Sequence, residues 1–268
     1  MTVSERLGHL LIAAFAWLVV IYLLMPLLVI VGSSFTTTAY LKFPPEGFTW
    51  VWYLKFLGDT SYLDSMWLSA MLAVCATILA IFLGVPVALV LSRESVIGSR
   101  TISAMFLSPL VLPTIVIGAA LLQYASALGF ARSFFALLVG HTVLVVPYIV
   151  RTTMASLAGF NRALEEAARD LGATGLQAFL LVTLPLIKPG LIAGALFAVI
   201  MSWINVELSM FNTTASLMPI PVKLFNYIQY NVDPMIAAVS ATTIYVAVLV
   251  VVALDLIVGI DKVATTRN

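Results

Sequence analysis

Six stretches of predominantly apolar residues alternate with shorter polar segments along the chain. They cover about residues 10–31, 66–91, 101–127, 133–150, 190–210 and 235–258. A helix needs about 20 mainly apolar residues to cross the hydrocarbon core of a bilayer. Because lipid offers no partner to backbone polar groups, apolar stretches of this length form helices. The pattern therefore predicts an all-α membrane protein with six transmembrane helices, in which residues 1–268 form one transmembrane domain.

The composition agrees with this class of protein. Hydrophobic residues make up 62% of the chain and charged residues only 9%, whereas a soluble domain carries about 25% charged residues. The net charge of +1 comes without a basic cluster, so we expect no nucleic-acid partner. Cys75, the single cysteine, cannot form an internal disulfide and is predicted to be a buried, inert thiol.

The first apolar stretch is longer than the core of a signal peptide, which spans roughly 7–15 residues. We therefore expect residues 10–31 to remain as the first transmembrane helix, with cleavage near Gly32-Ser33-Ser34 as the alternative. The loop that follows holds Trp50, Trp52 and Tyr53. Such aromatic rings are enriched where a membrane meets water, so these three are predicted to lie at that interface.

Prolines predict how the helices bend. Gly84 and Pro86 predict a bend near the inner end of the second helix. Pro109 and Pro113 both lie inside the third helix, and Pro147 lies inside the fourth.

The distribution of Lys and Arg predicts the orientation, because cytoplasmic loops carry an excess of both. If the N-terminus is cytoplasmic, nine cations lie on that side and four lie outside, which predicts that both termini are cytoplasmic. The cytoplasmic cations are Arg6, Arg93, Arg100, Arg151, Arg162, Arg169, Lys188, Lys262 and Arg267, and the outer ones are Lys42, Lys55, Arg132 and Lys223.

The longest polar interruption in the second half of the chain covers about residues 151–189. Asn161 is placed to cap a short helix there, and Gly172 is placed to end it. Thr174 and Gln177 have the spacing of a capping box for a second short helix. The segment is therefore predicted to be a helical elbow with a sharp joint between its two helices.

The end of the elbow is predicted from its prolines. Proline disfavours helical geometry in the residue before it, so the second short helix should end before Pro185. The chain is then expected to re-enter the membrane after Lys188-Pro189-Gly190.

The elbow also carries residues at fixed offsets. Glu166-Ala167-Ala168 is followed after three residues by Gly172, and after nine more by Val182-Thr183-Leu184-Pro185. This pattern closely resembles E-A-A-x3-G-x9-I-x-L-P, found in the cytoplasmic loop of binding-protein-dependent ABC importer permeases. Val182 in place of isoleucine is the one departure. The resemblance extends over roughly residues 60–260, and the alternative is an ordinary amphipathic surface helix.

The resemblance implies the type I ABC importer permease fold, with residues 151–189 as a cytoplasmic coupling-helix loop. In the family this loop docks in a groove on the ATP-binding subunit. The residues implied in that coupling are Glu165, Glu166, Ala167, Ala168, Asp170, Gly172, Leu184 and Pro185.

The resemblance also implies the partners and the location. We expect two ATP-binding subunits, a second permease subunit, either the same chain or a related one, and an extracytoplasmic solute-binding protein. The chain is expected to cross the bacterial inner membrane several times. ATP and Mg²⁺ would bind the partner subunits, and no cofactor is expected on this chain, because none of its lysines belongs to a G-x-x-x-x-G-K-[ST] loop.

No arrangement of residues in the sequence suggests catalysis or a metal site, since His9 and His141 are far apart and no H-E-x-x-H pair occurs. We therefore expect a transport subunit without enzymatic activity. His141 is interpreted as a packed, hydrogen-bonded residue within the membrane, with a proton relay as the alternative.

Glu207 is the most informative charge, because a carboxylate within hydrocarbon must face a polar cavity or a partner group. We place it in the outer half of the fifth helix, where it either lines the translocation path, meeting a cationic solute, or makes a structural hydrogen bond. Trp203 precedes it by four residues and would share its helix face. The predicted path residues are Trp203, Asn205, Glu207, Gln123 and Tyr124.

Two functions compete. The favoured one is a permease subunit of an ATP-driven importer for a small organic solute. Polyamine permeases are the most similar, although they carry acidic residues where this chain has Asn205-Val206-Glu207. The alternative is a stand-alone secondary transporter or channel that uses Glu207 and His141 as a proton or ion path, but that alternative leaves the elbow unexplained.

Overall fold

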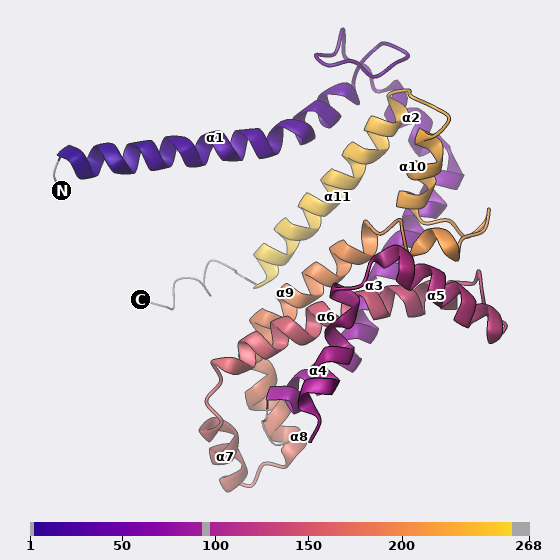
Figure 1. Cartoon of the computed structure of the whole chain (residues 1–268). Coiled ribbons are helices and arrows are strands. Elements are labelled where there is room, and N and C mark those ends of the chain that lie inside the picture. The colour runs from indigo at the N-terminus through magenta and orange to yellow at the C-terminus, as the bar shows by residue number, and fades with distance from the viewer. Residues whose placement is uncertain (1–2, 93–96, 259–268) are drawn as a thin grey trace. The chain divides into compact units, whose positions relative to one another are not determined.

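The structure, a computed structural model, describes residues 3–92 and 97–258 (Figure 1). Within these residues the chain is helical and forms no strand. The α-helices are α1 (Val3–Ser33), α2 (Val51–Gly58), α3 (Thr60–Ser92), α4 (Ser99–Leu107), α5 (Thr114–Ala127), α6 (Phe134–Ala158), α7 (Ala163–Asp170), α8 (Gly175–Ala178), α9 (Leu184–Trp203), α10 (Ile220–Ile228) and α11 (Met235–Val258). Two 3₁₀ turns, η1 (Ser108–Leu110) and η3 (Ser209–Phe211), and one π-helical turn, η2 (Phe179–Thr183), complete the order.

Four helical stretches within the described residues are long and apolar enough to cross a membrane. They are Gly8–Ser33, Thr60–Ser92, Phe134–Ala158 and Gly175–Trp203. The pair Ser99–Leu110 and Thr114–Ala127 makes a fifth if the two pieces form one bent span. The apolar part of α11, Met235–Val250, is shorter. The chain is thus a helical multi-pass membrane protein with four or five spans by this measure. The predicted count of six is not confirmed.

The predicted third helix is wrong as a continuous span. The chain breaks between η1 and α5, and the two pieces meet at an angle of 103°. Pro113 stands at the break in an extended conformation, with φ −58° and ψ 129°. Pro109 lies in η1, so two prolines four residues apart interrupt the hydrogen-bond ladder of one apolar stretch.

The predicted fifth helix is wrong at both ends. It starts before Pro185 instead of after Pro189, because α8, η2 and α9 form one helical run that passes through both prolines. The Leu184 N–H donates to the Phe179 carbonyl five residues back, in a wide π-helical turn. This turn offsets the missing proline N–H and the clash of its ring with the preceding turn.

The C-terminal ends of the fourth and fifth predicted helices also move. The fourth helix continues to Ala158, beyond its predicted end at residue 150, and α9 already ends at Trp203. The polar elbow between them is correspondingly shorter than predicted. Of the predicted cytoplasmic cations, Arg93, Lys262 and Arg267 lie outside the described residues.

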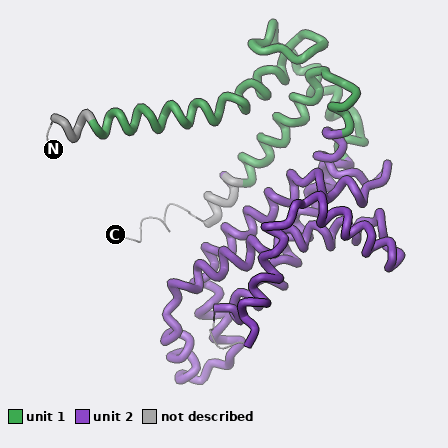
Figure 2. Tube along the Cα trace, viewed as in Figure 1, with its two compact units in different colours: residues 1–63, 226–250 green, residues 64–225, 251–268 purple. Residues whose placement is uncertain are grey.

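The chain divides into two compact units, residues 1–63 with 226–250 and residues 64–225 with 251–268 (Figure 2). In the first unit, Trp52 and Tyr53 of α2 are buried against Ala238 and Ala241 of α11. Trp50, by contrast, is exposed. Interfacial placement of these aromatic residues stays a prediction, and the burial of Trp52 and Tyr53 shows that they also build the core of this unit.

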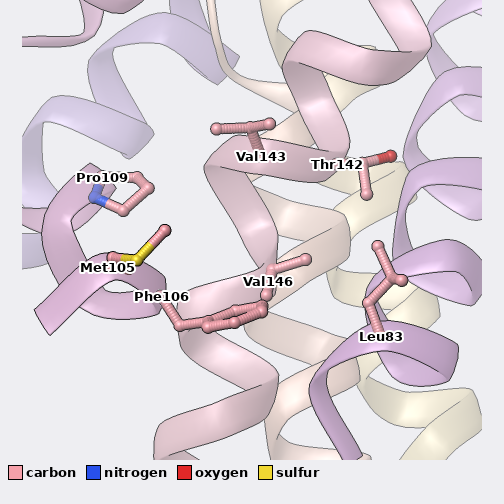
Figure 3. Close-up of a pocket in the computed structure, with 7 residues that line it drawn as sticks. All are labelled: Leu83, Met105, Phe106, Pro109, Thr142, Val143 and Val146. Carbon is pink, nitrogen blue, oxygen red and sulfur yellow. The ribbon is translucent and has the colours of Figure 1, made fainter. Parts of the chain in front are cut away.

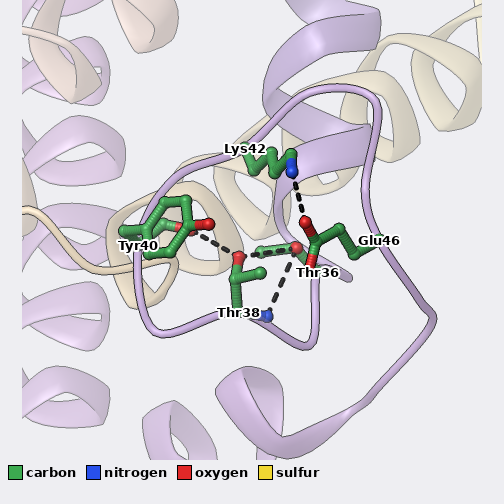
Figure 4. A network of polar contacts seen from close by, with 5 residues as sticks. All are labelled: Thr36, Thr38, Tyr40, Lys42 and Glu46. Atoms are coloured by element: carbon green, nitrogen blue, oxygen red, sulfur yellow. Dashed lines mark hydrogen bonds and ion pairs between the residues drawn. The ribbon is translucent and has the colours of Figure 1, made fainter.

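The loop that leads into α2 holds a network of polar contacts (Figure 4). The Thr36 and Thr38 hydroxyls lie 2.9 Å apart, and the Thr38 hydroxyl donates to the Tyr40 carbonyl at 2.7 Å. Lys42 and Glu46 form an ion pair across the same loop. These contacts give a long connection without regular structure a defined course.

In the second unit, α6 and α9 lie side by side and form the centre of the core (Figure 1). Two glycines of α9 allow this approach. A Cβ atom on Gly190 would lie 2.0 Å from Ser156 Oγ and 2.7 Å from the Thr152 carbonyl oxygen. A Cβ atom on Gly194 would lie 2.2 Å from Thr152 Oγ1. Small residues at such positions let membrane helices pack backbone to backbone.

A cavity of about 230 Å³ lies between α3, α4, η1 and α6 (Figure 3). Its lining residues are Leu83, Met105, Phe106, Pro109, Thr142, Val143 and Val146. Thr142 supplies a hydroxyl, which donates to the Leu138 carbonyl at 2.7 Å within its own helix. The walls are thus apolar and unsuited to a charged solute. Cys75 of α3 is half-buried rather than fully buried as predicted.

Candidate functional site

The elbow contains the predicted pair of short helices, α7 and α8. Asn161 Oδ1 accepts a hydrogen bond from the Ala163 N–H at 3.0 Å at the start of α7. The capping box of α8 is complete, with the Gln177 N–H donating to Thr174 Oγ1 at 3.3 Å and the Thr174 N–H donating to Gln177 Oε1 at 2.8 Å. Local side-chain chemistry therefore starts α8 as the sequence predicts, whereas the N-cap position of α7 is Arg162, which makes no side-chain cap, and Asn161 lies one residue before it.

Gly172 makes the sharp joint between the two helices. Its φ of +93° lies in the left-handed region, and nothing lies within 4 Å of where its Cβ would be. Its N–H donates to the Arg169 carbonyl at 2.9 Å, and the Ala173 N–H donates to the Ala168 carbonyl at 3.0 Å. The position therefore requires glycine for its backbone conformation, not for space.

Two long-range contacts tie the elbow to the membrane helices. Glu165 is buried, and its Oε1 accepts a hydrogen bond from the Thr183 hydroxyl in η2. Arg162 Nη2 donates to the Ser92 carbonyl, at the end of α3, at 2.7 Å. Both contacts border a cavity of about 30 Å³, which also involves Leu157 and Phe160. Through these contacts, a movement of the elbow can be transmitted to α3 and to the helical run that contains α9.

The outer surface of the elbow combines acids with exposed leucines. Glu166, Ala167 and Asp170 are exposed. Leu171 is 90% exposed, and Leu176 and Leu181 are exposed as well. We call Leu171, Leu176 and Leu181 the leucine patch. These leucines add exposed apolar side chains beside the charged residues of the elbow, and Leu176 and Leu181 also belong to the apolar helical run Gly175–Trp203.

The second region of interest is the bend after α9, residues 204–208. The predicted placement of Glu207 inside a helix is wrong, because α9 ends at Trp203 and Glu207 lies in the bend. The proposed helix face shared by Trp203 and Glu207 is therefore absent. Asn205 turns the chain, since its Oδ1 accepts a hydrogen bond from the Leu208 N–H at 2.9 Å. This side-chain hydrogen bond stabilises the turn that follows the helix.

Glu207 is exposed and faces the broken third helix. Its Oε2 accepts a hydrogen bond from the hydroxyl of Thr114, the first residue of α5. The break at Pro113 and the bend at Glu207 thus lie next to each other. Two interruptions in apolar helices place a carboxylate at a helix N-terminus, where negative charge is favourable.

Close packing fixes the bend against α5 and α6. Leu208 is only 1% exposed. A Cβ on Gly118 would lie 2.9 Å from Leu208 Cα, and a Cβ on Gly140 would lie 2.7 Å from Leu208 Cδ2. His141, next to Gly140, is also buried, with Nδ1 2.7 Å from Ser202 Oγ and Nε2 2.9 Å from Ser209 Oγ. The interpretation of His141 as a packed, hydrogen-bonded residue is confirmed.

The family model of binding-protein-dependent transport system inner membrane components matches residues 76–262. The chain belongs to this family. The matched residues include the broken third helix, the elbow and the bend, so both regions described above lie within the family's own domain. The chain is therefore a permease subunit of an ABC importer.

Curated relatives cover nearly the whole permease. Spermidine/putrescine transport system permease protein PotC of Haemophilus influenzae is 29% identical over 244 residues, covering 91% of this chain and 95% of that protein. Putrescine transport system permease protein PotI of Escherichia coli is 31% identical over 237 residues, covering 84% of each. The permease is thus similar to these two polyamine permeases along most of its length.

Solved structures show the same fold. A chain of a bacterial ABC transporter involved in the import of the acidic polysaccharide alginate matches with a TM-score of 0.73 at 19% identity, covering 97% of this permease and 98% of that chain. The bacterial alginate ABC transporter in complex with an alginate pentasaccharide-bound periplasmic protein matches with a TM-score of 0.67 at 13% identity, covering 94% of each chain. The fold of the permease is that of ABC importer membrane subunits.

The structure brings together some of the predicted path residues and not others. Asn205 and Glu207 lie in one bend, and Trp203 ends the helix before it. Gln123 and Tyr124 are exposed on α5, but Gln123 lies nine residues, about two and a half turns, from Thr114, which places it on the opposite helix face. Thr114 was missed, because its place beside Glu207 depends on the break at Pro113, which the sequence analysis did not predict.

The predicted coupling residues also separate. Glu166, Ala167, Asp170, Gly172 and Pro185 are exposed, and Ala168 is half-buried. Glu165 points inward to Thr183, and Leu184 packs against the core of α6 and α9. The exposure of the leucine patch was missed, and only Leu171 lies directly beside charged residues in the sequence.

Proposed function

We propose that this permease imports a polyamine-class cation, that ATP-binding subunits drive it through the elbow, and that Glu207 lines the path of the solute. Six transmembrane helices with both termini cytoplasmic would place the elbow in the cytoplasm and Glu207 toward the outer side. Two ATP-binding subunits would hold the ATP and Mg²⁺, so this chain needs no cofactor and no catalytic group. A second permease and an extracytoplasmic solute-binding protein would complete the importer in the bacterial inner membrane.

The elbow carries the proposal for energy coupling. Its outer surface exposes Glu166, Asp170 and the leucine patch, while Glu165 and Arg162 fasten its inner side to η2 and α3. A surface that can dock a soluble partner is thus rigidly joined to membrane helices. This arrangement supports transmission of ATP-driven closure to the bilayer, which is what an importer requires of this subunit.

The substrate class rests on the relatives and on Glu207. PotC and PotI are named as permeases for spermidine or putrescine. Glu207 offers an exposed carboxylate at the junction of two helix breaks, with Thr114 as its partner. A carboxylate at membrane depth is costly unless it serves a polar path, and a polyamine carries the opposite charge. The alternative of a stand-alone proton-driven transporter is not favoured, because the chain belongs to an importer family.

The test is uptake of radiolabelled spermidine and putrescine by cells in which the chromosomal copy of this chain is replaced by Glu207→Gln. This substitution keeps the shape and removes the charge. Loss of a close contact with a charged group costs about 1.5–3 kcal/mol, so the uptake rate per assembled importer should fall roughly ten- to a hundredfold.

Asp64→Asn is the matched control, since it removes another exposed carboxylate from the same unit. We expect it to transport at close to the native rate. If Glu207→Gln lowers the amount of assembled importer instead of its rate, Glu207 is structural. If spermidine and putrescine uptake do not depend on this chain at all, the substrate class is wrong.

The orientation has its own test. Lys55→Cys and Gly175→Cys, each in a Cys75→Ala background, should react on opposite sides of the membrane with an impermeant thiol reagent. Lys55 and Gly175 are both exposed, so each introduced thiol can be reached. Labelling of both from outside would contradict the proposed topology and, with it, the cytoplasmic position of the elbow.

A further inference from the structure

One imidazole joins the two sides of the bend. Ser202 lies in the last turn of α9, before the bend, and Ser209 is the first residue of η3, after it. His141 of α6 lies between them, with Nδ1 2.7 Å from Ser202 Oγ and Nε2 2.9 Å from Ser209 Oγ. His141 is thus a hydrogen-bond partner of both serines.

For a neutral imidazole, the hydrogen bonds allow one assignment of protons. The Ser209 hydroxyl donates to the Asn205 carbonyl at 2.9 Å, so its proton is already used. Nε2 of His141 must therefore donate to Ser209 Oγ, and Nδ1 must accept from the Ser202 hydroxyl. A neutral imidazole protonated on Nε2 satisfies all of these groups at once. Such a fully satisfied buried network fixes a single geometry.

The network involves residues on both sides of Glu207 in the chain. Asn205, two residues before it, is held by its own carbonyl and by its side chain, which accepts from the Leu208 N–H. Leu208, directly after it, packs closely against Gly118 and Gly140. The backbone on both sides of Glu207 is thus fixed, and the link from Asn205 through Ser209 to His141 joins it to α6.

We propose that His141 is a positioning residue: by holding Ser202 and Ser209 together, it sets the bend that presents the Glu207 carboxylate beside Thr114. The inference deepens the proposed function, since it rests on Glu207 lining the solute path. His141 itself does not touch the solute. An asparagine amide can replace only the contact made by Nδ1, and a glutamine amide can replace only the contact made by Nε2. Neither side chain can bind both serines at once, as the imidazole does.

The first test measures position without transport. Thr114→Cys and Glu207→Cys are introduced together into a Cys75→Ala background, and cross-linking by a short bifunctional thiol reagent is measured in membranes that contain the whole importer. Adding Ser209→Ala or His141→Gln should lower the cross-linking yield severalfold. Thr142→Ala is the matched control, since it removes a neighbouring buried hydroxyl of α6 that is bonded within its own helix. An unchanged yield with Ser209→Ala and His141→Gln would overturn the proposal.

The second test asks whether His141 acts through Glu207. In otherwise native permease, Ser209→Ala and His141→Gln should each lower spermidine uptake per assembled importer about tenfold. In a Glu207→Gln background the same changes should have no further effect, because coupled residues are non-additive. Fully additive losses, or a loss of assembled importer in place of rate, would mean that His141 only stabilises the fold, and this would overturn the proposal.

The two tests separate this proposal from the one it rests on. If Glu207→Gln transports normally while the cross-linking yield still depends on His141, the path role of Glu207 is wrong and the positioning of the bend stands. If Glu207→Gln is defective but neither Ser209→Ala nor His141→Gln changes the cross-linking yield, the path role stands and the positioning role is wrong.

Discussion

The two ends of α9 are built in opposite ways. At its N-terminal end, the elbow is shaped by neighbours in sequence, such as Asn161 with Ala163 and Thr174 with Gln177. At its C-terminal end, the bend is held by residues from distant helices, Thr114 of α5 and His141 of α6. The elbow therefore has a pattern that can be found in the sequence, whereas the bend also depends on contacts that form only after the helices have packed.

The helix between the two regions explains why they can differ so much. α9 has 20 residues and spans about 30 Å. It packs closely along α6 through Gly190 and Gly194, and the same α6 carries His141 at the far end of the contact. A locally built docking surface and a bend built by long-range contacts can thus work together, because one rigid pair of helices joins them.

Gly190→Ala should have the largest effect, because it disrupts the close packing of α6 and α9, which joins the two regions. The new Cβ would lie 2.7 Å from the Thr152 carbonyl oxygen, and a backbone atom cannot move aside as a side chain can. Overpacking of this kind costs roughly 1–3 kcal/mol. We expect a lower melting temperature of the purified importer and loss of transport. Gly159→Ala is the control, since nothing lies within 4 Å of its Cβ position. Equal behaviour of the two variants would contradict the close packing of α6 and α9.

Gly172→Ala should have the next largest effect, and it should be confined to the elbow. Alanine in the left-handed conformation costs about 1–2 kcal/mol, and Gly172 has a φ of +93°. We expect weaker retention of the ATP-binding subunits and slower transport, with normal insertion of the permease. In Gly175→Ala the added methyl group meets only Arg169 Nη2 at 3.8 Å, so this variant should behave as the native protein does. A defect of the same size in Gly175→Ala would mean that the backbone conformation at Gly172 is not the cause.

The two regions also differ in how far they can be predicted from the sequence. The helical membrane class, the capping box of α8 and the glycine joint follow from composition and local chemistry, and the structure contains them. The end of α9 did not follow, because apolar residues on both sides of Asn205 hide a stop that depends on hydrogen bonds within the bend. At Pro185 the opposite error occurred: the sequence predicted a helix end, but a π-helical turn lets the helix continue through this proline.

The candidate site divides along the same line. The elbow residues were found from fixed offsets, but the inward turn of Glu165 toward Thr183 could not be predicted, because it depends on where η2 lies. In the bend, Glu207 was singled out by its charge alone. Its partner Thr114 lies 93 positions away, and the serines on His141 lie 61 and 68 positions away. A single sequence gives no signal for pairs at that separation.

Thr174→Ala should have the smallest effect, and it tests whether the two ends of α9 are independent of each other. It removes the hydroxyl that caps α8 and leaves the rest of the elbow intact, at a cost of about 1 kcal/mol. We expect retention of the ATP-binding subunits to fall by roughly fivefold or less. Thr174→Ser, which keeps the hydroxyl, should restore it. Cross-linking between cysteines at positions 114 and 207 should stay unchanged, because the cap lies at the other end of the run from Gly175 to Trp203. If the cap of α8 changed that yield as Ser209→Ala does, the bend would not be set by His141 alone, and the two ends of α9 would be one cooperative structure instead of two separately built regions.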